Sequence, residues 1–207
     1  SPHTPAPLPE IRERRLLTEL LDESRARPDR GLVVLLDTDA RADMQRMYRL
    51  FCLVPTGLDA LNKVLRTYVT DRGKIINETT LCESKNTQMP SAEMAMSWVN
   101  QVLDTKSRLD GVLATSFQGD KSCEAAINEA MDTFINLNTR APEFISLYID
   151  EHLRKGTRFA DDTTALEPVL NKTITIFRYV HEKDVFERYY KMPLPRRLLH
   201  NRRASAG

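Results

Sequence analysis

Apolar residues recur at three- and four-residue spacing through most of this chain, and this periodicity strongly limits what it can fold into. Successive stretches between residues 11 and 191 show the pattern, and glycine or proline separates many of them. The connections are mostly short, which is typical of helices that pack against their sequence neighbours. Leu, Glu, Arg, Ala and Met, all good helix formers, are plentiful. We therefore predict an all-α fold, either a helical bundle or a helical solenoid.

Helix-ending and helix-starting signals divide the pattern into elements. Pro55 should stop a helix over residues 44–54, because proline cannot continue it. The long helix that opens at Pro90 should run as far as Gly119, a predicted C-cap. Asp120 can then cap the next helix with its carboxylate.

Two stretches are less clear from the pattern. Residues Gly31–Leu36 suit a buried strand by their β-branched content, but a lone strand would leave both of its edges unpaired. We therefore predict a short buried helix there. Cys82–Met89 is polar and has no apolar period, so we predict a loop.

Composition disfavours two classes of partner. The 30 basic and 29 acidic residues leave a formal charge of +1, which gives no support for a nucleic-acid-binding surface. No apolar run approaches the roughly 18 residues of a membrane span. We expect neither a nucleic-acid partner nor a membrane.

No catalytic, metal or cofactor site is predicted. Cys52, Cys82 and Cys123 are widely spaced and lack a nearby histidine, so we interpret them as small apolar residues of a reduced compartment. The four histidines show no metal-ligand spacing. The pair Asp161–Asp162 is better explained by a helix N-terminus than by acid–base chemistry. We predict that the chain is not an enzyme.

One segment near the end is unusually aromatic. In Lys183–Lys191 the residues Phe186, Tyr189 and Tyr190 share one face of a predicted helix, and charges fill the rest. This face is our candidate partner or interdomain surface.

A basic cluster follows this helix. Arg196 and Arg197 extend the candidate partner surface, although a solvated helix face would look the same. Ser205 follows two arginines and is a candidate phosphosite.

Several sequence blocks resemble the cullin family in order along the chain. They extend over residues 10 to 205, and the last is the most specific. The blocks are Asp43–Phe51, Leu103–Asp110, Phe134–Asn138, Pro142–Asp150, Leu153–Gly156 and Phe177–Lys191. Residues Asn136–Arg140 and Ser146–Asp150 look most like the branch that pairs with BTB-domain adaptors, the cullin-three branch.

The resemblance implies a stalk of cullin repeats, each a five-helix bundle. It implies a non-catalytic scaffold in a ubiquitin ligase, in the cytoplasm and nucleus, that spaces the adaptor from the RING module. The BTB-domain adaptor and the RING-box protein would bind through regions that do not match this chain, so no family binding residue is assigned here. We expect a Pro-rich, disordered lead-in over residues 1–9, the end of the second repeat over 10–37, the third repeat over 38–191 and a frayed basic tail over 192–207.

The chain departs from the family just after the last block. Pro193 and Pro195 stand where the family continues as a helix. The chain also begins at Ser1 and ends at Gly207, so we expect a piece of a longer protein, a truncated product or a truncated gene model. The alternatives are a helical interaction module that binds one partner without assembling a ligase and, last, an enzyme with an unrecognised site.

Overall fold

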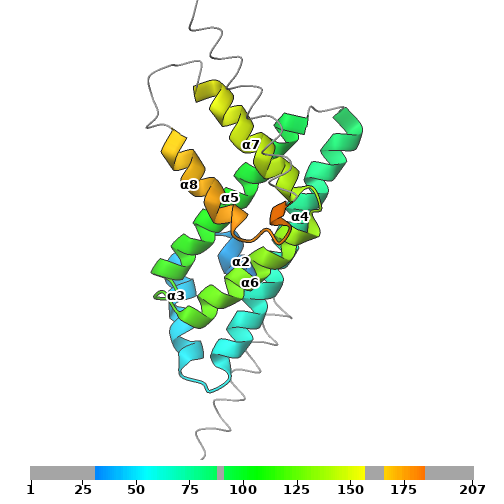
Figure 1. Ribbon diagram of the computed structural model, residues 1–207. Coiled ribbons are helices and arrows are strands. Elements are labelled where there is room, and N and C mark those ends of the chain that lie inside the picture. The colour runs from blue at the N-terminus through cyan, green and yellow to red at the C-terminus, as the bar shows by residue number, and fades with distance from the viewer. Residues whose placement is uncertain (1–30, 88–90, 157–165, 185–207) are drawn as a thin grey trace, which may run out of the picture. The chain divides into compact units, whose positions relative to one another are not determined.

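The computed structural model describes residues 31–87, 91–156 and 166–184 of the chain (Figure 1). Every regular element in these ranges is helical, and none is a strand, which confirms the predicted all-α fold. In chain order the helices are α2 (Leu32–Asp37), α3 (Arg41–Cys52), α4 (Gly57–Thr87), α5 (Ser91–Thr115), α6 (Lys121–Leu137), α7 (Ala141–Gly156) and α8 (Leu166–Phe177).

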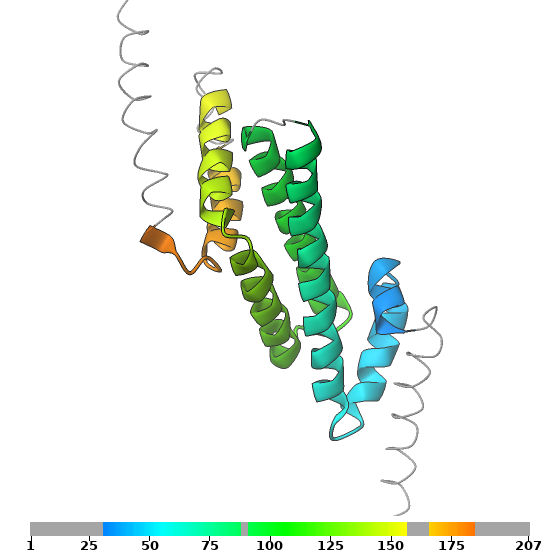
Figure 2. The ribbon, with the colours of Figure 1, turned by 90° about the vertical axis from the view of Figure 1, so that its right-hand side faces the viewer.

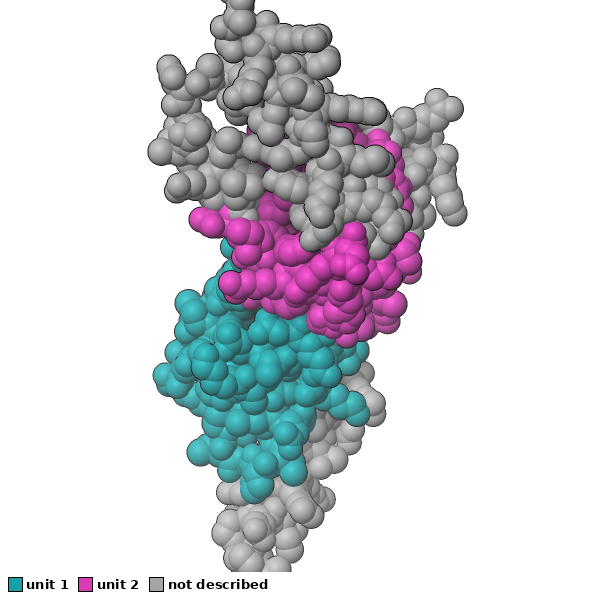
Figure 3. Space-filling model, viewed as in Figure 1, with its two compact units in different colours: residues 1–69, 107–130 teal, residues 70–106, 131–207 magenta. Residues whose placement is uncertain are grey.

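The described residues divide into two compact units, drawn in teal and magenta in Figure 3. Unit 1 contains residues 31–69 and 107–130, and unit 2 contains residues 70–87, 91–106, 131–156 and 166–184. Helices α4, α5 and α6 supply residues to both units, because the division falls within them. Each unit has its own set of buried apolar side chains.

The core of unit 1 follows the predicted helical period. On α3 the buried side chains are Met44, Tyr48 and Phe51, which the spacing places on one face. The ring of Tyr48 lies 5.7 Å from that of Phe117, which is fully buried after the end of α5. Burial of these large side chains is the main favourable term in the stability of the unit.

The core of unit 2 is richer in aromatic side chains. Trp98 of α5, Phe134 of α6 and Phe144 of α7 are all among the fully buried residues. The rings of Trp98 and Phe144 lie 5.8 Å apart at a tilted angle, a favourable arrangement for aromatic pairs. The helices α7 and α8 also pack against each other within this unit.

The stretch that suited either a strand or a helix forms α2. Leu32 and Leu36 are buried, which confirms the predicted short buried helix. It lies in the same compact unit as α3. The predicted repeat boundary between residues 37 and 38 stays a prediction.

A short turn joins α2 to α3 (Figure 2). Asp39 in this turn has a φ of 53°, a left-handed conformation that is uncommon for a residue other than glycine. The N-cap positions of the two helices, Gly31 and Ala40, make no side-chain capping hydrogen bond. Backbone bonds close the turn instead, such as the one from the Ala40 N–H to the Leu35 carbonyl at 3.0 Å.

The predicted loop at Cys82–Met89 is wrong for its first six residues. Helix α4 continues to Thr87, and residues 88–89 lie outside the described part of the chain. The physical reason is cooperative growth: extending an existing helix gains one hydrogen bond for each residue fixed, and the first proline comes only at Pro90. Polar composition alone did not indicate a loop here.

The end of α5 also differs from the prediction. The helix ends at Thr115, four residues before Gly119, because Gln118 and Gly119 both have left-handed backbone conformations. The Gly119 N–H donates to the Leu113 carbonyl at 2.9 Å and closes this turn. Asp120 caps α6 as predicted, since its Oδ1 accepts from the backbone N–H groups of Ser122 and Cys123 at 2.8 and 3.0 Å.

Candidate functional site

The residues predicted to form the partner surface lie outside the described part of the chain. These residues are Phe186, Tyr189, Tyr190, Arg196, Arg197 and the candidate phosphosite Ser205. From the aromatic stretch only Lys183 and Asp184 are described, and both are exposed. The Lys183 Nζ lies 5.9 Å from the centre of the Phe177 ring, a cation–π distance.

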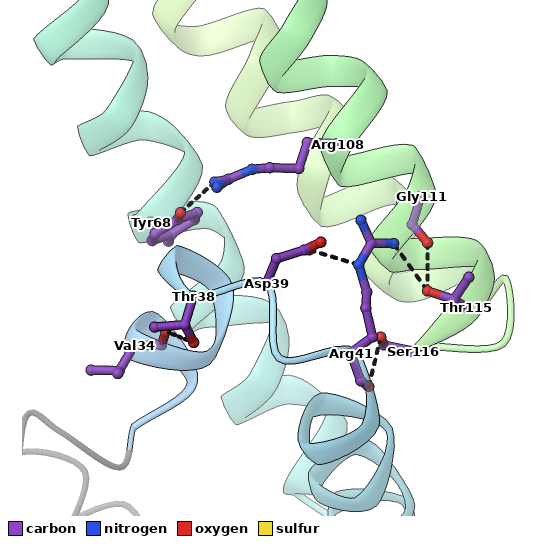
Figure 4. A network of polar contacts seen from close by, with 9 residues as sticks. All are labelled: Val34, Thr38, Asp39, Arg41, Tyr68, Arg108, Gly111, Thr115 and Ser116. Carbon is purple, nitrogen blue, oxygen red and sulfur yellow. Dashed lines mark hydrogen bonds and ion pairs between the residues drawn. The ribbon is translucent and has the colours of Figure 1, made fainter.

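A network of polar contacts in unit 1 surrounds the α2–α3 turn (Figure 4). The Arg41 guanidinium donates to the Asp39 carboxylate at 2.6 Å and to the Thr115 hydroxyl at 3.1 Å. The Ser116 hydroxyl, on a fully buried residue, donates to the Arg41 carbonyl at 3.1 Å. These bonds fasten the start of α3 to the end of α5.

A second set of contacts reaches the end of α2. The Tyr68 hydroxyl donates to the Asp37 carboxylate at 2.8 Å and accepts from the Arg108 guanidinium at 2.6 Å. Burial and the bond to Asp37 raise the pKa of Tyr68, and Arg108 partly opposes that rise. We call the seven residues Asp37, Asp39, Arg41, Tyr68, Arg108, Thr115 and Ser116 the turn clasp.

Polar side chains also gather at the start of α6. Besides capping the helix, Asp120 accepts from the Ser122 hydroxyl at 2.6 Å and from the Tyr48 hydroxyl at 3.1 Å. Burial alone would raise the pKa of the Asp120 carboxyl, but these bonds and those from the Ser122 and Cys123 backbone hold it below its ordinary value. The Asn62 side chain adds a bond to the Ser122 hydroxyl at 2.9 Å.

The buried polar contacts of unit 2 centre on one asparagine. Asn77 on α4 accepts from the Trp98 indole N–H at 2.7 Å and donates to the Phe134 carbonyl at 3.0 Å. All three residues are buried. One amide therefore satisfies the polar groups of two other helices, as buried polar groups require.

The segment after α8 is fastened to α6 within unit 2. The Asn136 amide donates to the Tyr179 carbonyl at 2.8 Å and accepts from the His181 backbone N–H at 3.0 Å. The His181 ring lies 2.9 Å from the Asp132 carboxylate. These contacts fix the chain just before the aromatic stretch.

The described cysteines do not resemble catalytic nucleophiles. Cys123 is fully buried, and burial raises the pKa of its thiol to about 12, which keeps it protonated. Cys52, the last residue of α3, is exposed, and the Cys82 side chain lies outside the described part.

The described residues contain neither a metal-binding cluster nor a membrane-spanning helix. No three His, Cys, Asp or Glu side chains lie close enough together to hold a metal ion. Within the same ranges, no helix combines the length and the hydropathy needed to cross a bilayer. The pair Asp161–Asp162 lies outside the described residues.

Sequence spacing did not indicate the turn clasp. Its partners are far apart in the chain: 74 positions separate Arg41 from Thr115, and 40 separate Tyr68 from Arg108. The blocks that resemble the family did include residues that make these polar contacts. Arg108 lies within Leu103–Asp110, and Tyr48, which bonds to Asp120, lies within Asp43–Phe51.

Comparisons with known proteins agree with this architecture. The described residues define an all-α protein of packed amphipathic helices. The family model described as the cullin alpha solenoid domain matches residues 1–206, so the chain belongs to the cullin family. The predicted family is thereby confirmed.

Three of the similar curated proteins are cullin-3 proteins. Cullin-3 of Schizosaccharomyces pombe is 38% identical over 206 residues, which cover 97% of this chain and 26% of that protein. Cullin-3A of Arabidopsis thaliana is 38% identical over 175 residues, with coverages of 84% and 22%. Cullin-3 of Dictyostelium discoideum is 34% identical over 200 residues, with coverages of 96% and 24%. The chain thus spans about a quarter of the length of these relatives.

Proposed function

We propose that this chain is a non-catalytic scaffold segment of a cullin-RING ubiquitin ligase. It would space a substrate adaptor from the RING module in ubiquitin-dependent protein degradation, in the cytoplasm and nucleus. The observation that supports this most strongly is the family match over residues 1–206, together with cullin-3 relatives that are 34–38% identical.

The contacts of the described residues suit a part that holds its shape. Helix ends in unit 1 are fastened by side chains from other helices, as at Arg41–Thr115 and Tyr48–Asp120. In unit 2 the Trp98–Asn77 bond is fully buried. Satisfied buried polar contacts of this kind favour one packing arrangement over others.

The partners follow from the branch of the family. Because the relatives are cullin-3 proteins, we propose a BTB-domain adaptor and a RING-box protein as the two ligase subunits. We further propose that neither the adaptor nor the RING-box protein binds the described residues directly.

Co-purification from cells tests the proposal. The protein is tagged at its own chromosomal locus, isolated at physiological salt and analysed by mass spectrometry for BTB-domain and RING-box proteins. We expect both, and a sample that contains neither would refute the scaffold role. Recovery of the adaptor alone would instead fit a module that binds one partner without assembling a ligase.

A further inference from the structure

We propose that Arg41 and Arg108 are positioning residues that fix the orientation of α2 within unit 1. The inference deepens the proposed function, because a scaffold segment has to hold its helices in one orientation. Both arginines act through the turn clasp and neither touches a substrate.

Local backbone bonds close the α2–α3 turn, among them the bond from the Ala40 N–H to the Leu35 carbonyl at 3.0 Å. The turn nevertheless contains Asp39 with a left-handed φ of 53°, and Ala40 supplies no capping side chain to α3. Such a conformation is unfavourable for a residue with a Cβ and persists when its surroundings over-determine it. The local bonds close the turn, and we infer that side-chain contacts from other helices hold the end of α2 in place.

Arg41 contacts both the turn and the end of α5. Its Nε donates to Asp39 at 2.6 Å, and its Nη1 donates to Thr115 at 3.1 Å. Figure 4 shows the guanidinium between these two partners. Because its side chain is 33% exposed, solvent weakens the ion pair but leaves its geometry. Arg41 therefore links the left-handed residue of the turn to the end of α5.

Arg108 acts on the end of α2, just before the turn. It donates to the Tyr68 hydroxyl at 2.6 Å, and that hydroxyl donates to Asp37, the last residue of α2, at 2.8 Å. The aromatic ring of Tyr68 is buried, so the hydroxyl cannot swing away without moving the core. Arg108 thus orients the end of α2 through Tyr68.

The guanidinium of Arg41 occupies space that a side chain at position 111 would need. Gly111 of α5 faces it, and a Cβ added there would lie 2.9 Å from Nη1 and 3.3 Å from Nη2. Alanine at this position would displace the guanidinium while making α5 a better helix. This glycine therefore offers a way to disturb the turn clasp without removing a polar group or weakening the fold.

The experiment measures the orientation of α2 directly. Nitroxide labels are placed at Val33 on α2 and Lys63 on α4, which are both exposed, and the distance distribution is recorded by pulsed electron spin resonance. The full chain carries Cys52→Ser and Cys82→Ser, and buried Cys123 stays. The test variants are Arg108→Gln and Gly111→Ala. Arg66→Gln, which removes the exposed 2.8 Å pair with Glu129, is the matched control.

We expect one narrow distribution in the parent chain and in Arg66→Gln. Arg108→Gln and Gly111→Ala should each broaden it by about twofold, as loss of a local restraint implies. In Gly111→Ala the melting temperature should stay the same or rise while the distribution broadens. If Arg41 only stabilised the fold, displacing its guanidinium would lower the melting temperature instead. An unchanged distribution in Gly111→Ala overturns the inference, and that variant decides the matter if Arg108→Gln does not fold. Because the distances are measured on the chain alone, a failed co-purification would refute the proposed function without changing this result.

Discussion

Unit 1 and unit 2 are stabilised by different kinds of contact. The core of unit 2 contains a buried aromatic pair, Trp98 and Phe144, and a buried amide at Asn77. In unit 1 charged and hydroxyl side chains join helix ends, and several of them are partly exposed. We therefore expect the core of unit 2 to respond mainly to changes in side-chain volume. Unit 1 should respond mainly to changes in charge and in turn geometry.

Two helix-interior glycines show the same contrast. A Cβ at Gly73 in unit 2 would overlap the ring of Phe134, which is buried and cannot retreat. A Cβ at Gly111 in unit 1 would meet only the far end of the Arg41 side chain. The same change, glycine to alanine, should therefore have opposite effects on stability in the two units.

The largest expected effect is in the core of unit 2. Trp98→Ala should lower the free energy of unfolding by about 3–5 kcal/mol, because it leaves a cavity and removes the partner of Asn77. Trp98→Phe keeps a ring but leaves the Asn77 oxygen without its donor, at a cost of about 1–3 kcal/mol. Urea unfolding followed by circular dichroism measures both. A change within about 0.5 kcal/mol for Trp98→Ala would show that this residue lies on the surface.

The next effect compares the two glycines. Gly73→Ala should destabilise by about 1–3 kcal/mol, because overpacking against Phe134 outweighs the better helix propensity of alanine. Gly111→Ala should be neutral or stabilise by up to about 1 kcal/mol. Thermal unfolding of the two variants side by side gives the answer. Equal shifts of the same sign would contradict the contrast between the units.

The smallest effect concerns charge in unit 1. Asp120→Ala should cost about 1 kcal/mol at pH 6, because it removes the cap of α6. Asp120→Asn, the control, should cost less, since asparagine also caps well.

The pH dependence of this effect has a definite sign. The folded-state pKa of Asp120 is lowered, so the contribution of its charge is complete above the unfolded pKa of about 3.9 and is lost as the pH falls through the folded value. The advantage of the parent chain over Asp120→Asn should therefore shrink between pH 6 and pH 2 in urea titrations. An advantage that grows on acidification would rule out this role of the carboxylate.

Local patterns predicted much of this fold. The all-α class, the short helix α2, the inward face of α3 and the Asp120 cap all depend on residues within a few positions of one another. Where a local pattern was weak, as at Cys82–Thr87, growth of an existing helix decided the outcome. Apolar periodicity thus predicted which residues form helices, whereas polar composition did not predict where α4 ends.

The turn clasp could not be predicted in the same way. Apart from the Arg41–Asp39 pair, its bonds join positions 31 to 75 residues apart, and no spacing rule relates Arg41 to Ser116 or Tyr68 to Asp37. Tertiary packing of α2–α5 brings them together, and a single sequence does not encode that packing as a pattern. The aromatic surface at Phe186, Tyr189 and Tyr190 was predicted from local spacing, and it lies outside the described residues.

We propose that this protein supports ubiquitin transfer without performing it, and one assay tests this proposal most directly. The ligase is isolated from cells in which the protein carries Cys52→Ser, Cys82→Ser and Cys123→Ala, so that no cysteine of this stretch can carry a ubiquitin thioester. Transfer of ubiquitin to the adaptor-bound substrate is then followed on non-reducing gels. We predict transfer at the parent rate and no reductant-sensitive ubiquitin adduct on residues 1–207. Loss of transfer in a variant that still recovers its partners, or such an adduct in the parent, would contradict the scaffold role.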